Sequence, residues 1–192
     1  MTTNRIRRRA RGYVLNELLL AVAAVSMLAA ASGGAYMYMK RSALADDMAL
    51  KMVTLVNDTR RAYQPVASFA TISASGLQKM GLVQKPLYTD GTNLYDAWAN
   101  QVTLAGADTY FALLLGGNGA MSAMECTTLV AGIQEVAYEV RVGAAAALAT
   151  GASVGRTTGG YAYKTAGGTF DVSALEAGCS EANTKIALSF DN

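Results

Sequence analysis

One acidic residue, Glu17, stands at the head of a long apolar stretch of this chain. The stretch covers residues 18–39 and contains no Asp, Glu, Lys or Arg. A carboxylate beside or inside hydrocarbon is costly, so a residue of this kind is expected to have a partner or a function. Glu17 is therefore the first candidate for chemistry, and the chemistry it offers is a charge pair with a cation.

Few other side chains suit catalysis. The 192-residue chain contains no histidine, which removes the general base of most serine and cysteine triads and the commonest metal ligand. Its two cysteines, Cys126 and Cys179, follow the apolar stretch. An even number of cysteines in an oxidising compartment favours one disulfide, with two buried free thiols as the alternative. We expect no enzyme activity, no cofactor and no metal site.

Two further stretches only partly match known ligand-binding motifs. Residues 151–157 place two glycines before Arg156, but their spacing differs from that of a phosphate-binding loop, so a flexible surface loop is favoured. Asp90, Asn93 and Asp96 lack the spacing of a calcium-binding loop. The Asp90-Gly91 pair instead predicts a turn.

Charge is unevenly distributed along the chain. Residues 1–12 contain five arginines and no acid, whereas the whole chain has 16 basic and 14 acidic residues. The remainder, with 11 basic and 14 acidic residues, is slightly acidic and offers no basic patch for nucleic acid. Arginines that flank an apolar stretch stay on the cytoplasmic side, which places residues 40–192 across the membrane.

The element expected to hold Glu17 is a long helix. About 20 apolar residues suffice to cross a bilayer, and the stretch at 18–39 reaches that length. Farther along, apolar residues recur at spacings of three and four, which predicts an amphipathic helix ending near Pro65. These residues are Leu44, Met48, Met52, Leu55 and Val56.

The predicted helix therefore covers residues 13–65, with its membrane-spanning part at 13–39. Gly33 and Gly34 are its predicted weak point, because each glycine costs about 1 kcal/mol relative to alanine in a helix interior.

Residues 66–192 have the pattern of an α+β head. Strands are expected at 101–104 and 109–115, joined by a hairpin connection, and at 138–142 and 185–190. Helical spacing covers residues 121–136. Residues 77–83 are expected to form a short helix or a turn, and residues 172–177 one or two helical turns. The Gly-, Ala- and Thr-rich segment at 143–168 predicts a loop with short edge strands.

The N-terminal combination resembles the class III signal of the type IV pilins. A short basic leader ends in Gly12, Tyr13 follows the expected cut, Glu17 is the fifth residue after it, and the charge-free stretch comes next. The head is similar to that of the type IVb pilins, notably those of conjugative thin pili. The similarity lies in Cys126 within Cys-Thr-Thr-Leu-Val and in Cys179 with the segment 183–190 that follows it.

This resemblance implies an α+β fold in which a long N-terminal helix packs on an antiparallel sheet and one disulfide joins Cys126 to Cys179. It also implies that a prepilin peptidase removes residues 1–12 and methylates the new amine of Tyr13. Glu17 would pair with that amine on a neighbouring subunit. Gly33 and Gly34 would lie where the helix stretches in the fibre.

The function implied is that of a major pilin, inserted in the inner membrane as a prepilin and then polymerised into an extracellular pilus of a Gram-negative-type bacterium. Its implied partners are further copies in a helical filament, the prepilin peptidase, the pilus assembly machinery, and a host or recipient cell surface. Two alternatives stay open: a minor pilin or type II secretion pseudopilin, and a signal-anchored periplasmic binding protein or enzyme.

Overall fold

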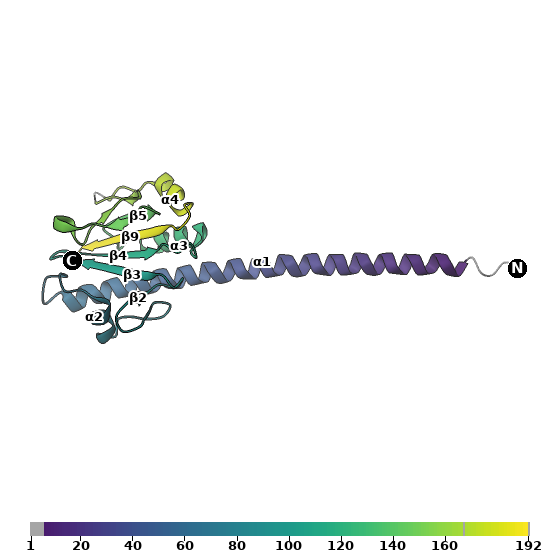
Figure 1. Ribbon diagram of the computed structural model, residues 1–192, viewed down its shortest axis with the longest axis horizontal. Helices are drawn as coiled ribbons and strands as arrows, with labels where there is room; N and C mark the ends of the chain where they lie inside the picture. The colour runs from purple at the N-terminus through teal and green to yellow at the C-terminus, as the bar shows by residue number, and fades with distance from the viewer. Residues whose placement is uncertain (1–5, 167, 192) are drawn as a thin grey trace. The chain divides into compact units, whose positions relative to one another are not determined.

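The computed structural model describes residues 6–166 and 168–191, except for the side chains of residues 6–18, 24 and 28–34. The chain divides into two compact units, Met1–Arg41 and Ser42–Asn192. Helix α1 (Ile6–Tyr63) begins in the first unit, and its C-terminal part belongs to the second unit together with every other element (Figure 1). We refer to the second unit as the head.

An antiparallel seven-stranded sheet forms the centre of the head. In spatial order its strands are β1 (Tyr88–Thr89), β2 (Leu94–Tyr95), β3 (Gln101–Gly106), β4 (Tyr110–Gly116), β9 (Lys185–Asp191), β5 (Glu139–Gly143) and β8 (Tyr161–Lys164). The last strand of the chain therefore lies between β4 and β5, in the middle of the sheet (Figure 1). The predicted α+β class and the predicted β3–β4 hairpin are confirmed.

One face of the sheet carries large apolar side chains in register. Phe111 of β4 lies opposite Phe190 of β9, and Leu188 lies between Leu113 of β4 and Val140 of β5. All five are buried, and they form one core with the buried residues of α1 and of α3 (Ala123–Ile133). Alternation along each strand thus places one apolar set toward the helices.

The head part of α1 supplies one side of this core. Its buried residues recur every three or four positions, as one face of a helix must. They are Ala45, Met48, Ala49, Met52, Leu55, Val56 and Thr59. The amphipathic helix expected from the sequence is therefore confirmed, and separating it from the sheet would expose this core to water.

A small ribbon covers the other face of the sheet. It consists of β6 (Ala147–Leu148), which pairs with β7 (Thr157–Thr158), and the short 3₁₀ helix η1 (Gly151–Ser153) lies between them. Ala187 and Ser189 of β9 are fully buried on this face. Alternation of apolar residues along the strand expected at 185–190 indicates one apolar face, with Ile186, Leu188 and Phe190, so burial of β9 on both faces is an addition that the structure makes.

The shorter helices start where a polar side chain caps them. Ser73 accepts a hydrogen bond from Gly76 N and begins α2 (Ala74–Lys79), so the helix begins before the short helix or turn that was expected at 77–83. Asp171 accepts hydrogen bonds from Ser173 N and Ala174 N and begins α4 (Val172–Cys179). Side-chain caps of this kind satisfy amide groups that have no partner within the helix.

Helices α1 and α3 approach so closely that any side chain at Gly132 would collide with Ala49. A Cβ added at Gly132 would lie 2.5 Å from Ala49 Cβ. We therefore expect Gly132→Ala to lower the free energy of unfolding by roughly 1–3 kcal/mol, the usual cost of overpacking a core. Urea denaturation followed by circular dichroism measures this loss.

The double variant Ala49→Gly/Gly132→Ala removes the clash and should recover much of the loss. Ala43→Gly, at an exposed position of α1, controls for the effect of glycine on helix stability. Strictly additive losses in the double variant would contradict close packing at this contact.

Candidate functional site

The N-terminal candidate residues lie on α1. The helix passes through Gly12, Tyr13, Glu17, Gly33 and Gly34. Beyond the course of the backbone, these residues lie outside the described part of the structure. Leader cleavage, methylation, the charge pair and the helix weak point therefore stay predictions. In the predicted membrane span, the side chains of residues 18, 24 and 28–34 also lie outside the described part of the structure.

The described side chains between residues 19 and 39 form an exposed apolar surface. The large apolar ones are between 59% and 72% exposed: Leu19, Leu20, Val22, Val25, Met27, Tyr36, Met37, Tyr38 and Met39. Among the described residues, no helix combines the length and the apolarity that crossing a membrane requires. An apolar surface of this extent marks a contact with protein or lipid.

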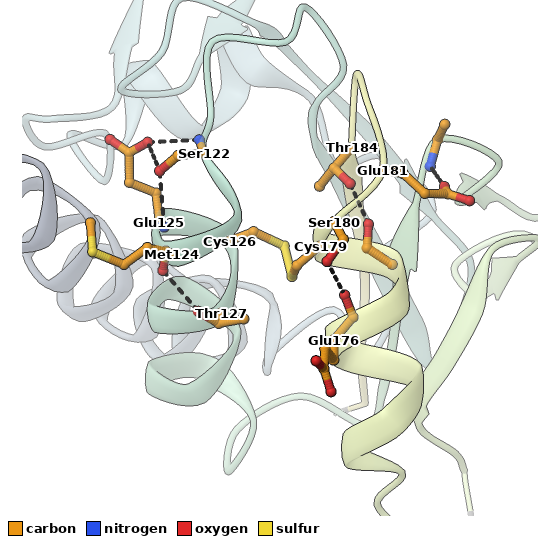
Figure 2. Close-up of a disulfide and its surroundings, with 12 residues drawn as sticks. Ser122, Met124, Glu125, Cys126, Thr127, Glu176, Cys179, Ser180, Glu181 and Thr184 are labelled. Carbon is orange, nitrogen blue, oxygen red and sulfur yellow. Dashed lines mark hydrogen bonds between the residues drawn. A yellow bond between two sulfur atoms is a disulfide. The ribbon is translucent and has the colours of Figure 1, made fainter.

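The predicted disulfide between Cys126 and Cys179 is formed, and it joins α3 to α4 (Figure 2). Their Cα atoms are 5.6 Å apart, and both residues are buried. The bond spans 53 positions of sequence, which corresponds to about 4 kcal/mol in the chain-entropy model. It fixes the two helices on one side of the core.

A capping box positions the first of these cysteines. The Glu125 carboxylate accepts hydrogen bonds from Ser122 N at 2.7 Å and from Ser122 Oγ at 2.6 Å, while Ser122 Oγ accepts one from Glu125 N (Figure 2). Glu125 is buried. This reciprocal pair fixes the first turn of α3, where Cys126 lies.

Close contact with the sheet positions the second cysteine. Gly178 lies against Val142 of β5, since an added Cβ would be 2.6 Å from Val142 Cγ2. The Thr184 hydroxyl donates a hydrogen bond to Gly178 O, and Ser180 Oγ donates one to Glu176 O at 2.7 Å (Figure 2). Because Cys179 follows Gly178 directly, these contacts hold its sulfur beside α3.

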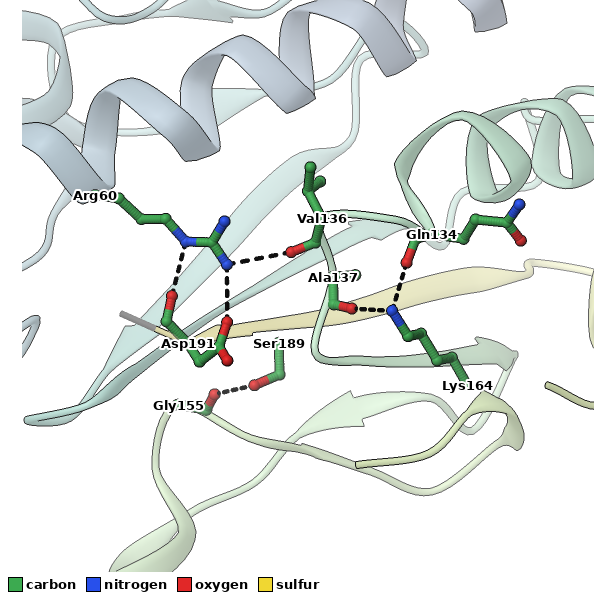
Figure 3. Close-up of polar contacts among 8 residues, drawn as sticks. All are labelled: Arg60, Gln134, Val136, Ala137, Gly155, Lys164, Ser189 and Asp191. Atoms are coloured by element: carbon green, nitrogen blue, oxygen red, sulfur yellow. Dashed lines mark hydrogen bonds and ion pairs between the residues drawn. The ribbon is translucent and has the colours of Figure 1, made fainter. Parts of the chain in front are cut away.

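Arg60 connects the end of α1 to the end of the sheet (Figure 3). Its Nε donates to Asp191 O at 2.7 Å, and its Nη2 donates to Asp191 Oδ1 at 2.8 Å and to Val136 O at 3.2 Å. Lys164 Nζ acts similarly on the end of α3, donating to Gln134 O and to Ala137 O. Sequence reasoning missed Arg60, because its partners lie 76 and 131 positions away.

Arg156 anchors residues 151–157, the segment that the sequence predicted as a flexible surface loop. Its guanidinium donates to both carboxylate oxygens of Glu139, at 3.1 and 3.2 Å. The same group lies 4.5 Å from the ring centre of Tyr110 and 4.6 Å from that of Tyr138. Burial alone would raise the pKa of Glu139, but the hydrogen bond and charge of Arg156 outweigh it and hold that pKa below its usual value.

The polar stretch at 90–96 serves two separate structural purposes. Asp90 accepts hydrogen bonds from Thr92 N and Asn93 N, and these backbone donors hold the pKa of its carboxyl well below the usual range. The predicted turn is thus confirmed. Asp96 is buried instead and accepts hydrogen bonds from Gly116 N at 3.0 Å and from Asn100 Nδ2.

The described residues contain no group of three His, Cys, Asp or Glu side chains placed to hold a metal ion.

No protein-family model matches this chain, and no curated protein matches it significantly. Among solved structures, the chain is similar to that of TcpA, a type IV pilin from Vibrio cholerae El Tor biotype. The two are 14% identical with a TM-score of 0.47, and the match covers 78% of this chain and 98% of that chain. Similarity at this level does not establish a function.

Loss of the disulfide should weaken the head. We expect the double variant Cys126→Ser/Cys179→Ser to unfold with a free energy lower by about 4 kcal/mol, because its unfolded chain is no longer cross-linked. Urea denaturation with and without reductant measures the difference. Reductant should leave the double variant unchanged, and an unfolding midpoint equal to that of the wild type would contradict a stabilising bond.

Acid should weaken the contact between Glu139 and Arg156. The folded-state pKa of Glu139 is lowered from 4.5, so its stabilisation is present above about pH 4.5 and is lost as the pH falls through the folded value. Glu139→Gln should therefore lose less stability than the wild type between about pH 6 and about pH 3. The exposed neighbour Glu135→Gln is the matched control and should keep the wild-type pH dependence. Equal pH dependence in all three proteins would contradict this role.

Proposed function

We propose that this chain is the structural subunit of a type IV pilus, a major pilin of the IVb-like class. The observation that carries the proposal is the N-terminal combination of a basic leader ending in Gly12, Glu17 five residues later, and a charge-free stretch. The architecture is consistent with it, since a long N-terminal helix, an antiparallel sheet and one disulfide are the elements that the resemblance implies.

The proposed route begins in the inner membrane. A prepilin peptidase cuts between Gly12 and Tyr13 on the cytoplasmic side and methylates the new amine of Tyr13. The positive leader is thereby replaced by a single cationic amine four positions before Glu17. Cleavage thus creates the partner that the carboxylate requires.

Assembly follows from the cost of leaving either charge alone. A carboxylate and an amine attract each other strongly at low dielectric, whereas each is disfavoured when isolated there. Glu17 of one subunit pairs with the Tyr13 amine of the next, so only the correct stagger satisfies both groups. The exposed apolar side chains between residues 19 and 39 support this proposal, because a filament of further copies would cover them.

The head has the corresponding task of forming the outer surface of the fibre. Its core is closed by the head part of α1, and its disulfide links α3 to α4, which supports a subunit built to persist outside the cell. Attachment to a host surface or to a mating partner is the role that we assign to the assembled fibre.

The charge of Glu17 should decide assembly. We expect Glu17→Gln, which keeps the shape of the side chain and removes its charge, to be processed and retained in the membrane without forming fibres. Electron microscopy and the yield of sheared fibres report assembly, and the N-terminal mass of the membrane-bound subunit reports cleavage after Gly12.

Asn16→Gln is the matched control for this experiment, because it changes a neighbouring uncharged residue, and it should assemble normally. Normal fibre yield from Glu17→Gln would overturn the charge-pair role. An N-terminus that begins after Ala31 instead of after Gly12 would overturn the proposed processing and favour a secreted periplasmic protein.

A further inference from the structure

A surface cavity lies beside the ribbon that covers the second face of the sheet. It has a volume of about 580 Å³ and is bordered by the β3–β4 turn at 107–109 and by residues 149–158. Pockets that hold small ligands typically measure about 300–1,000 Å³. The cavity lies within the head and involves none of the residues that the proposed assembly uses.

Several polar groups around the cavity retain hydrogen-bonding capacity. Arg156 uses Nε and Nη2 on Glu139, which leaves its Nη1 group without a protein partner among the described residues. Asp108 Oδ1 accepts a hydrogen bond from Ser68 Oγ, while Oδ2 has no such partner. In the described part of the chain, the hydroxyls of Thr109, Ser153 and Thr158 likewise have no protein partner. Both donors and acceptors are thus available.

The charges around the cavity restrict the class of ligand. Glu139 already neutralises Arg156, so Asp108 leaves one uncompensated negative charge. That charge repels phosphates and carboxylates. A hard cation prefers several oxygen ligands, and the described residues place no group of three acidic, histidine or cysteine side chains together here or elsewhere. A neutral ligand rich in hydroxyl groups matches the groups that are left, because it can donate to Asp108 Oδ2 and accept from Arg156 Nη1 without adding a charge.

The cavity also has apolar lining. Ala149, Ala152 and Val154 border it, together with Tyr110. Sugar rings present C–H groups on their faces and hydroxyls around their edges. A wall that combines small apolar side chains with hydroxyl, carboxylate and guanidinium groups matches both features.

The segment that forms the cavity is fixed by its own contacts with the sheet and with itself. Gly155 has φ +86°, and an added Cβ would lie 2.5 Å from Tyr110 O, so glycine permits this close approach. Gly155 O accepts a hydrogen bond from the buried Ser189 Oγ at 2.7 Å (Figure 3). Ala149 N donates to Arg156 O at 2.9 Å. A preformed site loses less conformational entropy on binding.

From this geometry we propose that the cavity between the β3–β4 turn and residues 149–158 binds a neutral carbohydrate. Arg156 Nη1 and Asp108 Oδ2 bind sugar hydroxyls, with the hydroxyls of Thr109, Ser153 and Thr158 around them. The proposal names a ligand class for the attachment role and rests on the proposed function only for that biological meaning, because binding itself requires the head alone.

The test uses the purified full-length chain in a zwitterionic detergent, since sugar-based detergents would compete. Galactose, N-acetylglucosamine and lactose are titrated and followed by ligand-observed NMR, with glucose 6-phosphate as the charged comparison. We expect at least one neutral sugar to bind with a dissociation constant on the order of 1 mM.

Two variants locate the site. Ala152→Trp, at an exposed position, fills the cavity, and Asp108→Ala removes the free carboxylate; each should weaken binding at least about tenfold, or about 1.4 kcal/mol. Thr103→Val, on an exposed position of β3 that does not border the cavity, should leave binding unchanged. Far-ultraviolet circular dichroism and an intact disulfide confirm that each variant is folded.

The proposal is overturned if none of the neutral sugars binds, if binding is the same in folded Ala152→Trp, or if glucose 6-phosphate binds more tightly than the neutral sugars. The outcome is separate from that of the assembly experiment. Glu17→Gln tests the fibre and leaves the cavity intact, whereas Ala152→Trp tests the cavity and leaves the N-terminal segment intact.

Discussion

The structure of the head depends on the burial of one face of α1. Met48, Met52 and Val56 are fully buried, and Ala49 touches α3 at the position where Gly132 has no side chain. A buried methionine, leucine or valine contributes roughly 1.5–3 kcal/mol relative to an exposed one, which is large beside the net stability of about 5–15 kcal/mol that is usual for folded proteins. The helix that carries the candidate assembly residues is therefore also a structural part of the head.

The other elements secure the ends of that arrangement. Arg60 binds the last described residue of β9, Asp191, so the end of α1 and the end of the central strand are held together. The disulfide holds α4 to α3, and Lys164 binds the carbonyls at the end of α3. A strand inserted between β4 and β5 contacts residues that are distant in sequence, and forming such contacts costs loop-closure entropy. The disulfide and the charged hydrogen bonds of Arg60 and Lys164 offset that cost.

Periodicity and local chemistry predicted much of the fold. The spacing of Met48, Met52 and Val56 indicated the buried face of α1, and the hairpin between β3 and β4 followed from its two strands and their short connection. The disulfide followed from the parity of the cysteines and the expected compartment. These features depend on residues near in sequence or on a single possible pairing.

The features that sequence could not predict depend on distant contacts. Nothing near Arg60 in sequence indicates Asp191, and nothing near residues 151–157 indicates that Arg156 reaches Glu139 and lies against Tyr110 and Tyr138. The glycines and small residues of that segment are typical of a loop, and only the strand order brings it over β9. For the same reason the cavity beside it has no sequence signature.

The face of the sheet that the β6–β7 ribbon covers explains both the contacts of residues 151–157 and the position of the cavity. Ala112, Ala187 and Ser189 are small, so the ribbon can lie directly over β4 and β9, and the buried Ser189 hydroxyl finds its partner in Gly155 O. The longer polar side chains, Glu139 and Arg156, must then lie at the edge of the ribbon, where they pair with each other and keep part of their surface accessible to solvent. The small residues that close the centre of this face thus leave a polar cavity at its edge, and the fold needs no additional element to form it.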